Sequence, residues 1–285
     1  MHKWLILILC LSSISTRGFA HYMERTFQDT RVINTQSVET VAQYRLDFRV
    51  GHRFGDIAGP FGGWNTFYGL EDASDIFIGF DYGITDHATV GIGRTKGSGP
   101  LRQLLHGNVK YRILTQNEGT PVSVTAYGLA SITTMSKSND ATAINYFATV
   151  KHRLSYHGEL LIARHFTPGF SLQINAGWTH RNIVSFGDQN DIWSVGLASR
   201  LKVSKSLALL LDAAYPISSL RTSENDYYMP LGVGIEIETG GHVFQVNLTN
   251  ATGIAETDFI PYTRKSWRKG EFRLGFTISR LFKIL

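Results

Sequence analysis

Charged side chains at alternate positions early in the sequence are the first residues whose types and spacing could do chemistry. Arg45, Asp47, Arg49 and Arg53 lie two or four positions apart, with mainly apolar residues between them. Because successive side chains of a β-strand point to opposite faces, this spacing places the four charges on one face. A face that carries guanidinium groups and a carboxylate can bind and select small charged solutes.

Further charged residues occupy the same kind of position in later segments. They are Asp81, Lys110, Arg112, Arg200, Lys202, Asp212, Glu236, Glu238 and Arg273. On one inner surface, the complete set would line a narrow pore with eight basic against five acidic groups. Such a pore favours anionic or zwitterionic solutes. The same groups could instead pair and close the lumen, since a charge buried in a narrow space must be paired. The sequence leaves both possibilities open.

Metal and cofactor chemistry is not predicted. His152 and His157, with His165 further along, lie at different levels of the expected structure and have no carboxylate at helical spacing. They therefore lack the pattern of a metal site. Gly91-Ile92-Gly93 begins like a dinucleotide-binding fingerprint, but the third glycine is misplaced and no helix is expected after it. We expect no metal and no cofactor.

The segments that carry the charges alternate between apolar and polar residues. The clearest are residues 44–54, 75–84, 104–114, 169–181 and 271–285, and weaker versions cover 88–95, 121–133, 155–166, 190–203, 206–215, 229–239 and 242–251. A period of two is typical of a β-strand. About twelve such segments, apolar on the side that would meet lipid, predict one all-β domain at 44–285. Its expected architecture is a single transmembrane antiparallel up-and-down β-barrel.

The composition agrees with this fold class. Charged residues make up 18% of the sequence and aromatic residues 12%, and there are 28 glycines. The aromatic content argues against a disordered chain, and no run of about 20 apolar residues suggests a membrane helix. Without residues 1–20, the chain would keep 26 basic and 23 acidic residues. This excess is too small to predict a nucleic-acid partner.

The connections between the expected strands alternate in length. The long ones cover residues 55–74, 96–103, 134–154, 182–189, 216–228 and 252–270, and the short ones cover 85–87, 115–120, 167–168, 204–205 and 240–241. Long external loops and short periplasmic turns are typical of outer-membrane barrels. A strand at 144–153 would break this alternation, so we assign these residues to an external loop.

The N-terminal residues predict a secretory signal peptide at 1–20. Lys3 precedes the apolar stretch 4–14, and small residues favour cleavage between Ala20 and His21. The only cysteine of the sequence, Cys10, falls within this peptide. Residues 21–43 are polar and lack alternation, and we expect an N-terminal periplasmic segment there, either a tail or a short plug.

Five short strings of the sequence resemble those of a known family. They are His52-Arg53-Phe54-Gly55, residues 79–86, Gly91-Ile92-Gly93-Arg94, Lys110-Tyr111-Arg112 and Leu161-Ile162-Ala163-Arg164. The family is an uncharacterised group of outer-membrane β-barrels, catalogued only as a domain of unknown function. This resemblance implies architecture and location, with no substrate or catalytic residue. The last strand, with Phe282 as its terminal aromatic residue, resembles the signal read by the barrel-assembly machinery, which is therefore an expected partner.

These observations predict an integral protein in the outer membrane of a Gram-negative bacterium, surrounded by outer-membrane lipid. The first hypothesis is a narrow passive channel for small anionic or zwitterionic solutes. The alternative is a closed barrel that acts as a structural scaffold and binds an envelope partner through external loops. A lipid-modifying enzyme is the third. Its outward candidates, His52 and Ser199, lie near opposite ends of distant strands, so we predict no catalytic residue.

Overall fold

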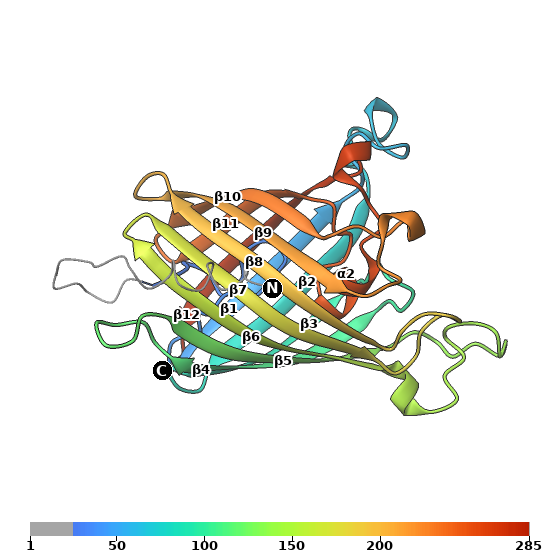
Figure 1. The fold of residues 1–285 in the computed structure, drawn as a ribbon, viewed down its shortest axis with the longest axis horizontal. Helices are drawn as coiled ribbons and strands as arrows, with labels where there is room; N and C mark the ends of the chain where they lie inside the picture. The colour runs from blue at the N-terminus through green and yellow to red at the C-terminus, as the bar shows by residue number, and fades with distance from the viewer. Residues whose placement is uncertain (1–24, 285) are drawn as a thin grey trace, which may run out of the picture.

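The computed structural model describes residues 25–284, which form a closed antiparallel β-barrel of twelve strands (Figure 1). The strands are β1 (Arg45–Phe54), β2 (Ala73–Gly83), β3 (Ala88–Thr95), β4 (Leu104–Leu114), β5 (Ser123–Thr133), β6 (Leu154–Thr167), β7 (Phe170–Arg181), β8 (Asp191–Lys202), β9 (Leu207–Ile217), β10 (Leu231–Thr239), β11 (His242–Thr249) and β12 (Arg273–Lys283). Consecutive strands pair, and β12 pairs with β1 from Arg45↔Lys283 to Arg53↔Gly275. The predicted up-and-down barrel is confirmed.

Burial alternates along the strands as the period of two requires. Large apolar side chains point outward, and Ile92 and Trp193 are 67% and 62% exposed. The polar side chains between such residues point into the barrel, where Thr95 and Ser194 are buried. An apolar exterior around a polar interior is the reverse of a soluble protein and suits a barrel surrounded by lipid.

The connections give the barrel two different ends. The long-loop end carries residues 55–72, 96–103, 134–153, 182–190, 218–230 and 250–272, and the short-turn end carries 84–87, 115–122, 168–169, 203–206 and 240–241. Short 3-10 helices lie in the long loops at η1 (Trp64–Thr66), η2 (Val150–Arg153), η3 (Ser223–Asn225) and η4 (Trp267–Lys269). The expectation that residues 144–153 form a loop and not a strand is confirmed.

Two segments that are not part of the wall enter the barrel. The first, residues 25–43, is the N-terminal segment, which folds back on itself with a bridge between Arg31 and Gln36. It reaches β1 at the short-turn end, where Tyr44 N–H donates to the carbonyl of Gly83 at 3.0 Å. The second, residues 250–266, is the α2 segment, which enters from the long-loop end (Figure 1). It carries the single α-helix of the described residues, α2 (Glu256–Tyr262).

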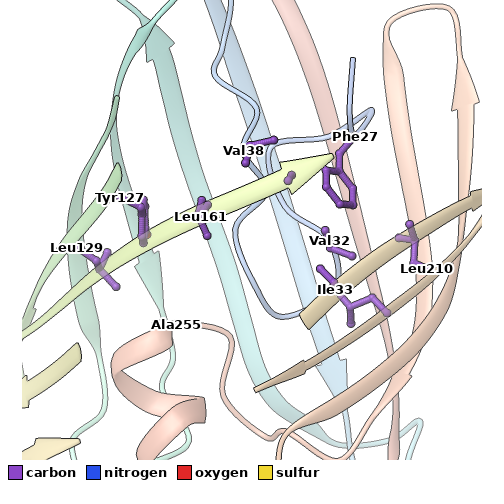
Figure 2. Close-up of a cluster of buried hydrophobic side chains, with 11 residues drawn as sticks. Phe27, Val32, Ile33, Val38, Tyr127, Leu129, Leu161, Leu210 and Ala255 are labelled. Atoms are coloured by element: carbon purple, nitrogen blue, oxygen red, sulfur yellow. The ribbon is translucent and has the colours of Figure 1, made fainter. Parts of the chain in front are cut away.

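The N-terminal segment brings an apolar core into the middle of the barrel. Figure 2 shows its side chains among those of the wall. The buried cluster consists of Phe27, Val32, Ile33, Val38, Tyr127, Leu129, Leu161, Ala163, Ala198, Leu210 and Ala255. Burying each large apolar side chain stabilises the fold by about 1.5–3 kcal/mol. The lumen is therefore a packed interior in this structure.

The sequence left the position of residues 21–43 open between a tail and a plug. Residues 25–43 lie inside the barrel as a plug, because Phe27, Val32, Ile33 and Val38 find apolar partners there. The predicted signal peptide and its cleavage site between Ala20 and His21 lie outside the described residues. Among residues 25–284, no helix is long and apolar enough to cross a membrane.

Candidate functional site in the barrel lumen

Asp212 of β9 holds the turn of the N-terminal segment. Its carboxylate accepts hydrogen bonds from the backbone N–H groups of Asn34, at 2.5 Å, and Thr35, at 3.0 Å. Asn34 Nδ2 donates a further bond at 2.6 Å. A Cβ at Gly232 on the next strand would lie 2.8 Å from Asp212 Oδ1 and 2.9 Å from Ile33 Cγ2. The glycine therefore lets the turn lie directly against the wall.

Arg49 of β1 lies between two carboxylates inside the barrel. It donates to Asp29 Oδ2 at 2.8 Å, contacts Asp29 Oδ1 as well, and donates to Asp47 Oδ2 at 2.8 Å. Ser279 of β12 donates to the other oxygen of Asp47 at 2.6 Å. The three charged side chains are at most 3% exposed. This group fixes the first part of the N-terminal segment to the wall by charge-assisted hydrogen bonds.

Arg53 of β1 joins both inner segments to the wall. Its guanidinium donates to Asn34 Oδ1 at 2.6 Å and to the carbonyl of Ala251 at 3.3 Å, and it also bonds the carbonyl of Gly253. The N-terminal segment and the α2 segment therefore share one buried cation. Movement of either segment would leave donors of Arg53 unsatisfied.

Glu256 at the start of α2 forms a direct contact between the two inner segments. Its carboxylate lies 3.3 Å from Arg31 Nη2 and accepts a hydrogen bond from Gln36 Nε2 at 2.9 Å. Burial acts to raise the pKa of Glu256, but Arg31 and other neighbours outweigh it and hold the pKa below its usual value. Burial acts to lower the pKa of Arg31, and Glu256 reverses this so that the pKa lies above its usual value. The two groups therefore form a charged pair.

A second acidic residue of α2, Asp258, contacts the loop between β3 and β4. Its carboxylate accepts hydrogen bonds from the backbone N–H of Ser98 at 2.7 Å and from the Ser98 hydroxyl at 3.3 Å. Asp75 of β2 accepts from the backbone N–H of Ile254 at 2.8 Å and thereby holds the chain just before α2. Burial, reinforced by the negative charge of Asp75, raises the pKa of Asp258 to about 7.

The residues predicted to line the lumen differ in burial. Those that are buried are Asp47, Arg49, Arg53, Lys110, Asp212, Glu236 and Arg273. Those that are half-buried are Asp81, Arg112, Arg200, Lys202 and Glu238. Arg45, the first residue of β1, is exposed at the short-turn end. The strands therefore bring most of this set into the interior, where contact with the inner segments limits their exposure.

Two cations of β4 also hold the N-terminal segment. Lys110 Nζ donates to the carbonyls of Thr30 at 2.9 Å and Ser37 at 3.1 Å. Arg112 Nη2 lies 2.8 Å from Glu39 Oε2. These contacts lie on both arms of the folded segment and fix it to the wall opposite β9.

Other charges of the predicted set pair within the wall or with the long loops. Arg200 Nε donates to Glu236 Oε1 at 2.7 Å, which joins β8 to β10. Arg273 of β12 pairs with Asp56 in the loop after β1, and Lys265 Nζ lies 2.9 Å from the same carboxylate. Cations that could line an open pore are thus paired in this structure.

The sequence patterns did not identify the acidic partners of the buried cations. Asp29, Glu39, Asp56 and Glu256 lie outside the strands, where no alternation indicates a direction. One signal was available, because basic residues outnumber acidic ones in the predicted lumen. Buried cations require anionic partners, so the polar N-terminal segment and a long loop were the places to look for them.

Space remains at both ends of the packed interior. At the short-turn end, a cavity of about 60 Å³ lies beside Asp29, Asp47 and Glu238. At the long-loop end, a hollow of about 540 Å³ is lined by residues that include Arg221 and Tyr262. Between these two spaces, the inner segments pack against the wall in the middle of the barrel.

The candidate metal-binding and catalytic side chains do not form a site within residues 25–284. No group of three or more His, Cys, Asp or Glu side chains in these residues is placed to hold a metal ion. His157 bonds Thr179 Oγ1 through Nδ1 at 2.8 Å. His52 lies on β1 and Ser199 on β8, and these strands are not neighbours in the barrel. The outward pair considered for lipid hydrolysis is therefore not brought together.

A family comparison accounts for nearly all of the described chain. Residues 27–282 match the family described as "Membrane bound beta barrel domain (DUF5777)". The chain belongs to this family. The resemblance found in short sequence strings is thereby confirmed, and this DUF5777 protein is a membrane-bound β-barrel. No curated protein matches the sequence.

Two solved structures with a similar fold are an outer-membrane channel and a porin. One is an outer membrane channel from Pseudomonas putida F1, with a TM-score of 0.52 and 14% identity over 86% of this chain and 98% of that one. Another is the KdgM porin, with a TM-score of 0.50 and 7% identity over 84% of this chain and 99% of that one. At such low identity, the likeness to the DUF5777 protein is one of fold alone.

Proposed function

We propose that this DUF5777 protein is an outer-membrane channel for small solutes that is closed at rest by its two inner segments. The shared fold of outer-membrane channels supports this proposal. The observation that carries it is the polar contact between the two segments that fill the barrel. Glu256 pairs with Arg31 and accepts a hydrogen bond from Gln36, and Arg31 Nη1 donates to the carbonyl of Ile254 at 3.3 Å. Such contacts can break and form again without unfolding the wall.

The α2 segment is the part that would move first. Its helix buries two large apolar side chains, Phe259 and Ile260, which stabilise docking by about 3–6 kcal/mol. The N-terminal segment buries twice as many in the central cluster, worth about 6–12 kcal/mol by the same measure. Departure of α2 would also leave the half-buried Arg31 without its carboxylate partner, and an unpaired, largely desolvated charge favours rearrangement of the N-terminal segment.

The open passage would favour anionic or zwitterionic solutes. Arg49, Arg53 and Lys110 are buried cations of the wall that now bond the inner segments. Once released, they would present positive charge to the passage and attract anions. The KdgM porin has also been solved in complex with disordered oligogalacturonate, which is a polyanion.

A disulfide that holds α2 in place tests this mechanism. Ser131 Oγ of β5 and Thr257 Oγ1 of α2 lie 3.1 Å apart, so Ser131→Cys with Thr257→Cys can form a cross-link. Single-channel conductance is measured in planar bilayers with the wild-type protein and with the oxidised and reduced double variant. We expect openings in the wild-type and reduced proteins and their loss in the oxidised protein.

Each single-cysteine variant serves as the control, since it carries the same substitution without the cross-link. Oxidation of these variants is expected to leave conductance unchanged. A wild-type protein and a reduced double variant that never conduct would overturn the channel. Equal conductance in the oxidised and reduced forms would overturn the role of α2 as its gate.

A scaffold that binds an envelope partner is the second candidate. Its support is the loop 55–72, where Phe61, Trp64 and Phe67 are 72%, 73% and 51% exposed. Exposed aromatic residues of this kind favour protein contacts. Co-purification from mild detergent, compared between the wild type and Trp64→Ser, tests it. Loss of a stoichiometric partner in the variant would support the scaffold, and solitary behaviour of the wild type would contradict it.

A further inference from the structure

The outer wall of the barrel carries a groove over β2, β3 and β4. It has a volume of about 770 Å³. Its lining comprises Ile76, Ile78, Gly79, Phe80, Ile92, Gly93, Arg94, Thr95, Lys96, Gln103, Leu105 and His106. Gly79 and Gly93 pair across the β2–β3 ladder, and a Cβ at either position would point inward onto the ring of Phe77. The exposed apolar side chains of the lining, such as Ile78, Ile92 and Leu105, place the groove on the lipid-facing surface and make it mainly apolar.

Basic side chains stand at the long-loop end of this groove. Arg94 is the last residue but one of β3, and Lys96 follows the strand directly. Both side chains are exposed, as is that of the nearby Arg102. Lys96 Nζ bonds the carbonyl of Ala73. Within residues 25–284, the guanidinium groups of Arg94 and Arg102 have no hydrogen bond or ion pair, and no acidic residue lines the groove.

The outward arginines at the opposite end of the barrel are in a different environment. Arg164 of β6 lies over the ring of Phe166 at 5.1 Å, and Arg280 of β12 lies over the ring of Phe282 at 4.8 Å. These cations are covered by aromatic faces. Arg94 has no such ring contact among the described residues, and it borders an apolar groove. It is therefore placed to meet an anion outside the protein.

We propose that this groove binds a phosphate-bearing acyl lipid of the leaflet at the long-loop end. The hydrocarbon chain would lie along Ile78, Ile92 and Leu105, where burial of apolar surface favours it. The phosphate would lie between Arg94 and Lys96. A guanidinium group can donate two parallel hydrogen bonds to phosphate oxygens, and long basic side chains reach the membrane interface. This proposal requires the membrane location of the barrel but no conduction through it.

Binding of bisphosphorylated lipid A to the full-length protein provides the test. Native mass spectrometry of protein released from detergent measures the lipid-bound fraction as the lipid is titrated. Lipid A without phosphate groups is titrated in parallel. We expect the phosphorylated lipid to bind at least about tenfold more tightly, because a charge-assisted phosphate contact contributes more than about 1.4 kcal/mol.

Two variants locate the binding site. Arg94→Ala with Lys96→Ala removes the phosphate contacts, and Leu105→Trp fills the groove while retaining both cations. Each is expected to weaken lipid A binding at least about tenfold. Arg280→Ala is the matched control, since it removes an outward arginine from the other end of the barrel, and it should bind as the wild type does.

Three outcomes would overturn the proposal. The first is equal binding by the Arg94→Ala/Lys96→Ala variant and Arg280→Ala. The second is equal affinity for the lipids with and without phosphate. The third is a complex of two chains without lipid that Leu105→Trp dissociates, which would assign the groove to contact between copies. Binding of lipid A by a protein that fails to conduct would leave this inference intact while contradicting the proposed function.

Discussion

Arg49 illustrates how single charges are tolerated inside this barrel, because its neighbours Asp29 and Asp47 are buried with it. Replacing Arg49 with methionine would leave two carboxylates buried without their cation. The expected loss of stability is about 3–5 kcal/mol, since breaking a buried ion pair exposes the desolvation cost of the remaining charge. Guanidinium chloride unfolding of the detergent-solubilised protein measures this loss.

Arg45 on the same strand supplies a matched control. It is exposed at the short-turn end, so Arg45→Met removes the same charge without burying a partner. This substitution should change the free energy of unfolding by no more than about 0.5 kcal/mol. Equal destabilisation by both substitutions would mean that Arg49 acts through net charge and not through its buried contacts.

Asp258 makes docking of the α2 segment depend on pH. Its pKa is raised from 3.8 to about 7 in the docked position, so docking takes up a proton. Docking is therefore strongest below about pH 4, weakens as the pH rises, and has lost this contribution above about pH 7. For a channel gated by α2, conductance should rise between about pH 4 and pH 7, by up to about tenfold for each pH unit in the steepest part.

Asp258→Asn separates this carboxyl from other titrating groups. The amide stays neutral and can still accept a hydrogen bond from Ser98, so the rise in conductance over this range should flatten. Glu256 affects docking in the opposite direction. Its pKa is lowered, so its contribution to docking is present at neutral pH and is lost only in more acidic solution. A pH profile that is the same in the wild type and Asp258→Asn would contradict the assignment.

At the scale of elements, the path of the N-terminal segment depends on a missing side chain in β2. A Cβ at Gly83 would lie 2.1 Å from the carbonyl oxygen of Ala42 and 2.5 Å from that of Val41. Gly83→Val should therefore displace the end of the segment and leave the wall paired. We expect maleimide to label Val38→Cys at least about tenfold faster when Gly83→Val is also present than when it is absent. Position 38 is buried, and local opening limits such labelling.

Gly107→Val is the control for this substitution. Gly107 lies on β4, and a Cβ there would meet no atom within 4 Å. Labelling at position 38 should then remain as slow as in the unmodified barrel. Equal acceleration by both valines would indicate general loosening of the barrel and not displacement of the N-terminal segment.

The wall strands could be predicted closely because one physical pattern governs all of them. The expected bounds 88–95 and 104–114 coincide with β3 and β4, and β2 begins two residues before the expected 75. Each wall residue faces either lipid or the lumen, so the period of two persists along the whole strand. The connections then follow from where the alternation stops.

The inner segments could not be predicted in the same way. Phe27, Ile33 and Val38 lie at irregular spacing in a polar stretch, and their burial depends on a surface formed by β5, β6 and β9. The α2 segment was expected as part of an external loop at 252–270, but residues 250–266 fold inward. Contacts such as that of Glu256 with Arg31 join residues far apart in the sequence, and no local pattern encodes them.

At the scale of the whole molecule, closure of the barrel and filling of its lumen are separate features. The wall closes through the β1–β12 ladder and needs no inner segment to complete its backbone hydrogen bonds. The inner segments contact the wall mainly through side chains. The wall is therefore expected to persist while the inner segments move, which is the condition that a gated channel requires.

The arrangement of loops also predicts how the barrel lies in its membrane. Short turns and the connection from the N-terminal segment to β1 share one end, and the long loops share the other. Outer-membrane barrels keep short turns in the periplasm and long loops outside.

Ser136 lies exposed in a long loop, and Ser204 lies exposed in a short turn. In a Gram-negative host, a membrane-impermeant maleimide should label Ser136→Cys on intact cells but Ser204→Cys only after the outer membrane is permeabilised. The natural Cys10 falls in the predicted signal peptide, so the wild-type protein serves as the unlabelled control. Labelling of Ser204→Cys alone on intact cells would reverse the orientation, and the lipid proposed for the Arg94 groove would then belong to the inner leaflet.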